Sequence, residues 1–190
     1  MLNKKMIIYF SDRGETNTDE TFKAAKDRAT ELGIRDIVVA STGGQTGVKA
    51  VETFKDHNVI VVSHVTGMKE PGLQELSDEM AKKIKAGGGK ILTTTHAFSG
   101  VNRAIQKRFN TMYPVGIIAE TLRLFGQGMK VCVEITAMAA DAGLIPADKD
   151  VIAISGSGRG ADTAIVIKPA NSHNLFDMVV KEIIAKPSKT

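Results

Sequence analysis

Short apolar runs alternate along this chain with longer stretches in which apolar residues recur every three or four positions. The runs at residues 6–10, 37–40, 59–62 and 90–94 are rich in Ile and Val, which is typical of strands buried in a sheet. The stretches between them have the spacing of amphipathic helices. Strands that alternate with helices predict a parallel sheet with right-handed crossovers and with helices on both faces.

Capping residues predict where the first helices begin and end. Asn17, with Glu20 three positions later, is expected to start the first helix through a capping box, and Gly33 is expected to end it. Pro71 is expected at the first position of a later helix, which breaks at the glycines of residues 87–89. The inner face of that helix is expected to consist of Leu73, Leu76, Met80 and Ile84.

The second half of the chain is expected to be helical over residues 101–144, with interruptions at Pro114 and at residues 126–128. A strand at 151–154, a glycine-rich segment at 155–163, a strand at 164–167 and a closing helix at about 175–185 follow. β-branched residues and Pro169 come after the alternating glycines instead of a helix, which argues against a dinucleotide-binding turn. We therefore expect a hairpin whose last strand is antiparallel to its neighbour.

Together these elements predict one domain over residues 1–190 with a three-layer α/β/α fold. Its sheet is expected to be mostly parallel, with an antiparallel last strand, and a helical insert is expected at about residues 101–128. The length of 190 residues suits a single hydrophobic core.

Composition narrows the classes of partner. The net charge of +4 comes from interleaved basic and acidic residues, and the chain has no Trp and two Tyr, so nothing indicates a nucleic-acid surface. No apolar stretch is long enough to cross a membrane. Cys132, the one cysteine, lies among apolar residues and is expected to be an inert buried thiol. We expect a cytoplasmic protein without nucleic-acid, membrane or metal partners, while self-association into a homo-oligomer stays open.

Four loops carry the candidate chemistry. Those after residues 40, 62 and 92 follow parallel strands at their carboxyl ends, the edge where open α/β sheets bind ligands. Their residues are small or hydroxylic, with His64 and His96 at matching places, and the glycine-rich segment is expected to join them. Backbone N–H groups and hydroxyls at a helix N-terminus favour an anion, so residues 41–46 are the expected phosphate-binding turn. The alternatives are an ordinary loop with Thr42 or Thr46 as N-cap, and a mobile surface loop at 155–163.

These loops indicate a phosphorylated small molecule, such as a nucleotide or sugar phosphate, as the ligand. We expect Gly44→Asp to repel its phosphate and to leave the fold intact. His96 is the candidate general base, with a purely hydrogen-bonding role as the alternative. The expected ligand contacts are Ser41, Thr42, Gly43, Gly44, Gln45, Thr46, Thr66, Gly67, Thr94, Thr95, His96, Ser155, Gly156, Gly158, Arg159, Gly160, Ala161, Asp162 and Thr163.

The order of these elements resembles the C-terminal α/β domain of pyruvate kinase. Residues 37–46 are similar to the strand and Ser/Thr-rich turn that in that domain hold a phosphate of the sugar-bisphosphate activator, and residues 150–166 are similar to its final strand, glycine loop and antiparallel strand. The catalytic barrel of pyruvate kinase has no counterpart here, so we expect no pyruvate kinase activity. The insert at 101–128 is foreign to the kinase domain.

With this insert, the chain resembles more closely the small stand-alone proteins of archaea and bacteria built on this domain. The residues that carry this resemblance are Asn17-Thr18, Thr95-His96, Ser99-Gly100 and Gly160-Ala161-Asp162-Thr163. That resemblance implies FMN as the cofactor and, if the protein is an enzyme, a flavin-dependent oxidoreductase. Two alternatives remain: a non-enzymatic sensor of a sugar bisphosphate or other phosphometabolite, and a phosphoester-processing enzyme that uses His96.

Overall fold

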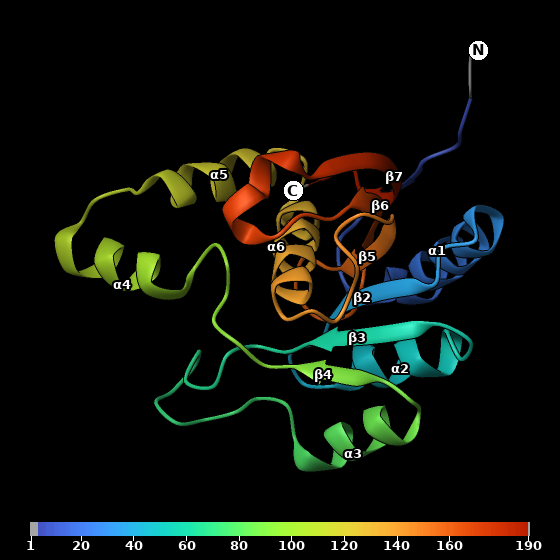
Figure 1. Ribbon diagram of the computed structural model, residues 1–190, viewed down its shortest axis with the longest axis horizontal. Helices are drawn as coiled ribbons and strands as arrows, with labels where there is room; N and C mark the ends of the chain where they lie inside the picture. Colours follow the sequence, from blue (N-terminus) through green and yellow to red (C-terminus); the bar gives the residue numbers. More distant parts are fainter. Residues whose placement is uncertain (1–3, 190) are drawn as a thin grey trace.

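A seven-stranded sheet in the order β1-β7-β6-β5-β2-β3-β4 forms the centre of the computed structural model, which describes residues 4–189 (Figure 1). The strands are β1 (Ile8–Phe10), β2 (Asp36–Ala40), β3 (Asn58–Val62), β4 (Lys90–Leu92), β5 (Val151–Ser155), β6 (Thr163–Lys168) and β7 (Val179–Pro187). The helices are α1 (Thr18–Leu32), α2 (Gln45–Thr53), α3 (Asp78–Ala86), α4 (Gly100–Phe109), α5 (Pro114–Arg123) and α6 (Gln127–Asp141), with short 3-10 helices η1 (Glu15–Asn17) and η2 (Ser172–Asp177).

The predicted α/β fold with a mostly parallel sheet is confirmed. β6 is antiparallel to both of its neighbours, β5 and β7, whereas every other adjacent pair is parallel. The glycine-rich segment therefore closes a hairpin, with Ser155 paired to Thr163 across it, as the sequence predicts. The carboxyl ends of β2, β3, β4 and β5 lie at one edge of the sheet, called the carboxyl edge below.

Alternate residues of the central strands pack into two separate layers of core. Val39 and Ile154 belong to the cluster that contains residues of α1, α2 and α3. Val38 and Ala153 belong to the cluster on the opposite face, which contains most of the buried residues of α6. The period of two along a strand thus buries both faces of β2 and β5.

The prediction that a helix begins at Pro71 is wrong. Residues 63–77 form a long loop, and α3 begins only after Ser77, whose hydroxyl accepts a hydrogen bond from the N–H of Met80. Ser77 is followed by two acidic residues, a combination that stabilises a helix N-terminus better than Pro71 followed by Gly72, which has a positive φ of 76°. Leu73 consequently lies in the loop, where it is exposed.

The prediction of a closing helix at about residues 175–185 is also wrong. Only η2 is helical there, and residues from Val179 onward form β7, which pairs with β6 on one side and with β1 on the other. The apolar residues of this segment fit the period of a helix as well as that of a strand. The strand is favoured by its hydrogen bonds to two neighbouring strands and by its β-branched residues Val179, Val180, Ile183 and Ile184.

Two expectations at the N-terminal side need correction. Residues 6–10 were expected to form a buried strand, but β1 is an edge strand in which Tyr9 is 58% exposed. Asn17 precedes α1, yet its side chain makes no capping bond and donates instead to the carbonyl of Asp12. Gly33 ends α1 in the left-handed conformation, as predicted.

The segment between β4 and α6 contains two helices that the pattern predicts. Pro114 occupies the first turn of α5, which packs against α6. α4 buries none of its residues and lies away from the sheet (Figure 1). No helix in the described range 4–189 is long and apolar enough to span a membrane.

Candidate functional site

The turn between β2 and α2 presents unused backbone donors at the carboxyl edge. Ser41 is buried, and its Oγ accepts the N–H of Gly47 at 3.0 Å. This side chain thus satisfies one backbone donor in the first turn of α2. Within residues 4–189, no hydrogen bond uses the N–H groups of residues 43–46. Residues 43 and 44 precede the nine-residue helix α2 and residues 45 and 46 begin it, so the four groups lie at its positive end, an arrangement that suits an anion.

Gly44 is required by packing as well as by backbone geometry. Its φ is +101°, and a Cβ at this position would overlap the side chain of Met80 and lie 2.8 Å from Leu76 Cδ1. The expectation that Gly44→Asp leaves the fold intact is therefore wrong. Gly43 differs, because a Cβ there would meet only the flexible side chain of Gln45.

His64, in the loop after β3, lies against this turn. Its Nδ1 is 2.8 Å from Glu75 Oε2 and its Nε2 is 3.2 Å from the hydroxyl of Thr42. The imidazole is 38% exposed, so it is accessible from solvent while held on two sides. Hydroxyl, imidazole and carboxylate thus form a chain of polar groups that links Glu75, in the loop at residues 63–77, to the turn at residues 41–46.

His96, in the loop after β4, is held by protein groups at both ring nitrogens. Its Nε2 accepts the N–H of Val65 at 3.3 Å, and its Nδ1 is 3.7 Å from the carboxylate of Glu134 on α6. Glu134 also accepts hydrogen bonds from the ammonium of Lys130 and from the N–H of Phe98. A histidine engaged in this way suits positioning of the loop better than proton transfer.

The carboxylate of Glu134 is buried, with 2% of its side chain exposed. Burial alone would raise its pKa, but the imidazole of His96, the charge of Lys130 and the bonds from Lys130 and Phe98 together lower the pKa to about 2. Glu134 is therefore an anion at every physiological pH. Its charge and that of Lys130 lie beneath the His96 loop.

The loops after β2, β3 and β4 meet as the sequence predicts. The hydroxyls of Ser63 and Thr93 are 2.6 Å apart, and the rings of His64 and His96 lie edge to face with centroids separated by 5.6 Å. Thr94 and Thr95 are exposed next to His96. Thr66 and Gly67 lie farther along the β3 loop, in a turn to which Gln74 and Leu73 supply hydrogen bonds.

The glycine-rich segment, residues 155–163, is anchored to the start of α1. The buried Asp162 accepts the N–H groups of Gly14 and Ser157 and the hydroxyl of Thr163. Thr18 accepts the N–H of Ala161. Of the residues expected to contact a ligand, Ser155, Ala161, Asp162 and Thr163 are thus buried, whereas Gly158 and Arg159 are exposed at the tip of the segment.

Two glycines of this segment should tolerate alanine very differently. Gly160 has a φ of +74°, and its Cβ would lie 2.5 Å from Glu15 Cα and overlap the hydroxyl of Thr18. We expect Gly160→Ala to cost about 2 kcal/mol or more in urea unfolding, because both strain and overlap oppose it. Gly158→Ala is the matched control and should change stability by less than about 0.5 kcal/mol, since no atom lies within 4 Å of its Cβ position. Equal losses in the two variants would contradict the anchored segment.

The sequence pattern did not identify three charged residues at this edge. Glu75 supports His64, while Lys130 and Glu134 lie behind His96. For Glu75 nothing in the local pattern distinguishes it from an exposed loop carboxylate. Lys130 and Glu134 did carry a signal, because they are four residues apart in an otherwise apolar helix, where charges are expected to pair.

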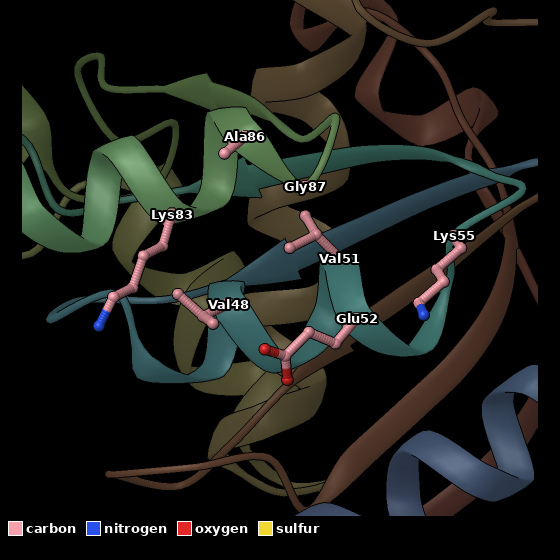
Figure 2. A pocket seen from close by; sticks show the side chains of 7 residues that line it. All are labelled: Val48, Val51, Glu52, Lys55, Lys83, Ala86 and Gly87. Carbon is pink, nitrogen blue, oxygen red and sulfur yellow. The ribbon is translucent and has the colours of Figure 1, made fainter.

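Away from this edge, a hollow of about 550 Å³ lies between α2 and α3 (Figure 2). Figure 2 shows the side chains of Lys83 and Glu52 at its sides. Its lining is Val48, Val51, Glu52, Lys55, Lys83, Ala86 and Gly87. None of the expected ligand contacts belongs to this lining, so the hollow is separate from the candidate site.

Fold and site together define an α/β protein that gathers backbone N–H groups, hydroxyls and two histidines at the carboxyl edge of its sheet. The chain belongs to the family described as pyruvate kinase, alpha/beta domain, whose model matches residues 19–167. It is similar to the pyruvate kinase of Cryptosporidium parvum in complex with ADP, at 14% identity and a TM-score of 0.37, over 73% of this chain and 20% of the kinase. A second crystal structure of that organism's enzyme matches at 15% identity and a TM-score of 0.38, over the same shares. The chain thus spans about a fifth of the length of these kinases.

Proposed function

We propose that this protein binds a phosphorylated ligand, FMN in the first place, at the carboxyl edge of its sheet. The observation that carries the proposal is the turn at residues 41–46, where the N–H groups of residues 43–46 lie at the start of α2 and have no hydrogen-bond partner among residues 4–189. The loops after β3 and β4 meet beside this turn, which gives a ligand larger than phosphate further groups to contact. FMN itself is suggested by the resemblance to small stand-alone proteins built on this domain.

The donors available at the turn suit a phosphate monoester. The N–H groups of residues 43–46 and the hydroxyl of Thr42 would hold the phosphate oxygens, and the exposed guanidinium of Arg159 is a second candidate partner. Thr94 and Thr95 are the residues proposed to lie toward the rest of the ligand. When bound, FMN would supply reversible one- and two-electron chemistry.

The residues of this edge favour binding over catalysis. Both nitrogens of His96 face protein groups, so we propose that His96 shapes the site and is not a general base. The buried residues of the glycine-rich segment act in this proposal as supports, while its exposed tip contacts the ligand.

The test compares two substitutions of Gly43, a position that accepts a side chain. Gly43→Asp places a negative charge at the turn, whereas Gly43→Asn has nearly the same shape and no charge. In fluorescence titrations with FMN, the aspartate variant should bind at least tenfold more weakly than the asparagine variant, a difference of about 1.4 kcal/mol. After FMN is added and the unbound excess is removed by gel filtration, the wild type should keep the visible absorption of flavin.

Equal FMN affinity in the two variants would show that the phosphate does not bind at residues 41–46. A protein that binds a sugar bisphosphate but is colourless after the same removal of unbound FMN would instead support the alternative of a metabolite sensor. Circular dichroism of each variant controls for the fold.

A further inference from the structure

Thr42, His64 and Glu75 form an ordered chain of three polar groups next to the phosphate-binding turn. The carboxylate of Glu75 lies 2.8 Å from His64 Nδ1, and the hydroxyl of Thr42 lies 3.2 Å from His64 Nε2. Thr42 comes from the loop after β2, whereas His64 and Glu75 come from opposite ends of the loop at residues 63–77. Nothing in the proposed function so far uses Glu75 or His64.

The partners determine where the imidazole proton sits. A carboxylate only accepts hydrogen bonds, so the proton of a neutral imidazole lies on Nδ1, toward Glu75. Nε2 then carries the lone pair, and the hydroxyl of Thr42 donates to it. In this arrangement the Thr42 proton points away from the turn, and His64 offers a lone pair where an anion would need a donor.

The turn itself supplies little positive charge. Residues 41–46 include no Lys or Arg, and a phosphate monoester carries close to two negative charges at neutral pH. The groups that face His64 are Glu75, which is acidic, and the ring of His96, behind which Glu134 lies paired with Lys130. His64, which contacts Thr42 of the turn, can therefore gain a positive charge next to a bound phosphate.

We propose that phosphate binding at residues 41–46 is coupled to the uptake of one proton by His64, with Glu75 as the positioning residue. The proton adds to Nε2, which turns from acceptor to donor and releases the hydroxyl of Thr42. Both groups then donate to phosphate oxygens, while Glu75 compensates the charge of the imidazolium through Nδ1–H. This inference rests on the proposed phosphate site and concerns any dianionic phosphate, whether FMN or the free ion.

Isothermal titration calorimetry measures the coupling directly. FMN and inorganic phosphate are each titrated into the wild-type protein at pH 7.5, in two buffers with different heats of ionisation. The difference in measured heat gives the net number of protons exchanged, to which the phosphate contributes as well, because its second ionisation lies near neutral pH. The same titrations of His64→Gln contain only the contribution of the phosphate, so the wild type should take up more protons than this variant, by up to one per ligand.

Variants assign the proton to His64. His64→Gln should abolish this additional uptake and weaken binding at pH 7.5 at least tenfold. Glu75→Gln should keep the fold and reduce the uptake, because the amide can still accept from Nδ1 but no longer balances the imidazolium charge. His173→Gln is the matched control: His173 is exposed in η2, beyond the opposite edge of the sheet, and its loss should change neither uptake nor affinity.

A spectroscopic measurement on the wild type removes dependence on any variant. Nitrogen-15 spectra should show both ring nitrogens of His64 changing to the charged form when inorganic phosphate is added. Binding with equal proton uptake in the wild type and in His64→Gln would overturn the inference and leave the phosphate site standing. Additional uptake in the wild type with inorganic phosphate but no binding of FMN would overturn FMN as the ligand and support the inference. Binding of neither compound would overturn both.

Discussion

Replacing Glu134 with glutamine should lower the free energy of unfolding by about 3 to 5 kcal/mol, the usual cost of removing one partner from a buried ion pair. Glutamine still accepts hydrogen bonds, but it leaves the charge of Lys130, 7% exposed, without a counter-charge in the core. For a chain of this length the loss should appear as a decrease in Tm of about 10 °C. Urea unfolding followed by circular dichroism gives the free energy itself.

The chain offers a matched control in Glu79, which pairs with Lys83 at the same spacing of four residues on the exposed side of α3. Glu79→Gln should cost less than about 1 kcal/mol, because exposed pairs contribute little. The double variant Lys130→Met with Glu134→Gln should recover most of the loss, since it removes both charges together. A cost at Glu134 no larger than that at Glu79 would show that the buried pair does not stabilise the fold.

The carboxylate of Glu134 should also make the stability of the protein depend on pH in the acidic range. The pKa of Glu134 is lowered from about 4.5 to about 2, so its contribution is complete above pH 4.5 and is lost as the pH falls toward 2. The wild type should therefore lose stability over this range, while Glu134→Gln has no such group to titrate. The difference in unfolding free energy between the two proteins should shrink accordingly.

Asp162→Ala should cost about 3 kcal/mol, the second largest effect that we expect, because it removes an acceptor for three donors at once. These donors are the N–H groups of Gly14 and Ser157 and the hydroxyl of Thr163. Asp162 is fully buried, so water does not readily replace its carboxylate at all three positions. Urea unfolding measures the loss.

Asp162→Asn keeps one acceptor oxygen and should cost less than the alanine variant. The control is Asp177→Ala, at an exposed aspartate in η2, where a change below about 0.5 kcal/mol is expected. If Asp162→Ala is as stable as this control, the glycine-rich segment is not anchored through its aspartate.

Much of the architecture follows from local pattern. The alternation of apolar runs and helical spacings predicts the order from α1 to β4, and Pro169 with β-branched residues after the glycines predicts the β5–β6 hairpin. The rule that parallel strands end at a common edge also predicts that the loops after β2, β3 and β4 meet. These features depend on residues close together in sequence.

The predictions are wrong where residues distant in sequence determine the local structure. The segment from Val179 onward has apolar residues that suit a helix or a strand, and only the neighbours β6 and β1 select the strand. Pro71 is a good first residue of a helix in isolation, yet the capping bond of Ser77 lies six residues later. Glu75 becomes recognisable as a site residue only when the fold places it against His64.

The position of β7 has a consequence for the order of folding. Ile8 pairs with Ala185, so two strands from opposite ends of the described chain lie side by side, and β7 also completes the hydrogen bonds of β6. During synthesis from the N-terminus, β1 has no neighbour until the residues of β7 have left the ribosome. Closing so long a segment is entropically costly and slow, whereas β2, β3 and β4 are close in sequence. The β2–β3–β4 half of the sheet should therefore form first, and the edge built by β1 and β7 should form last.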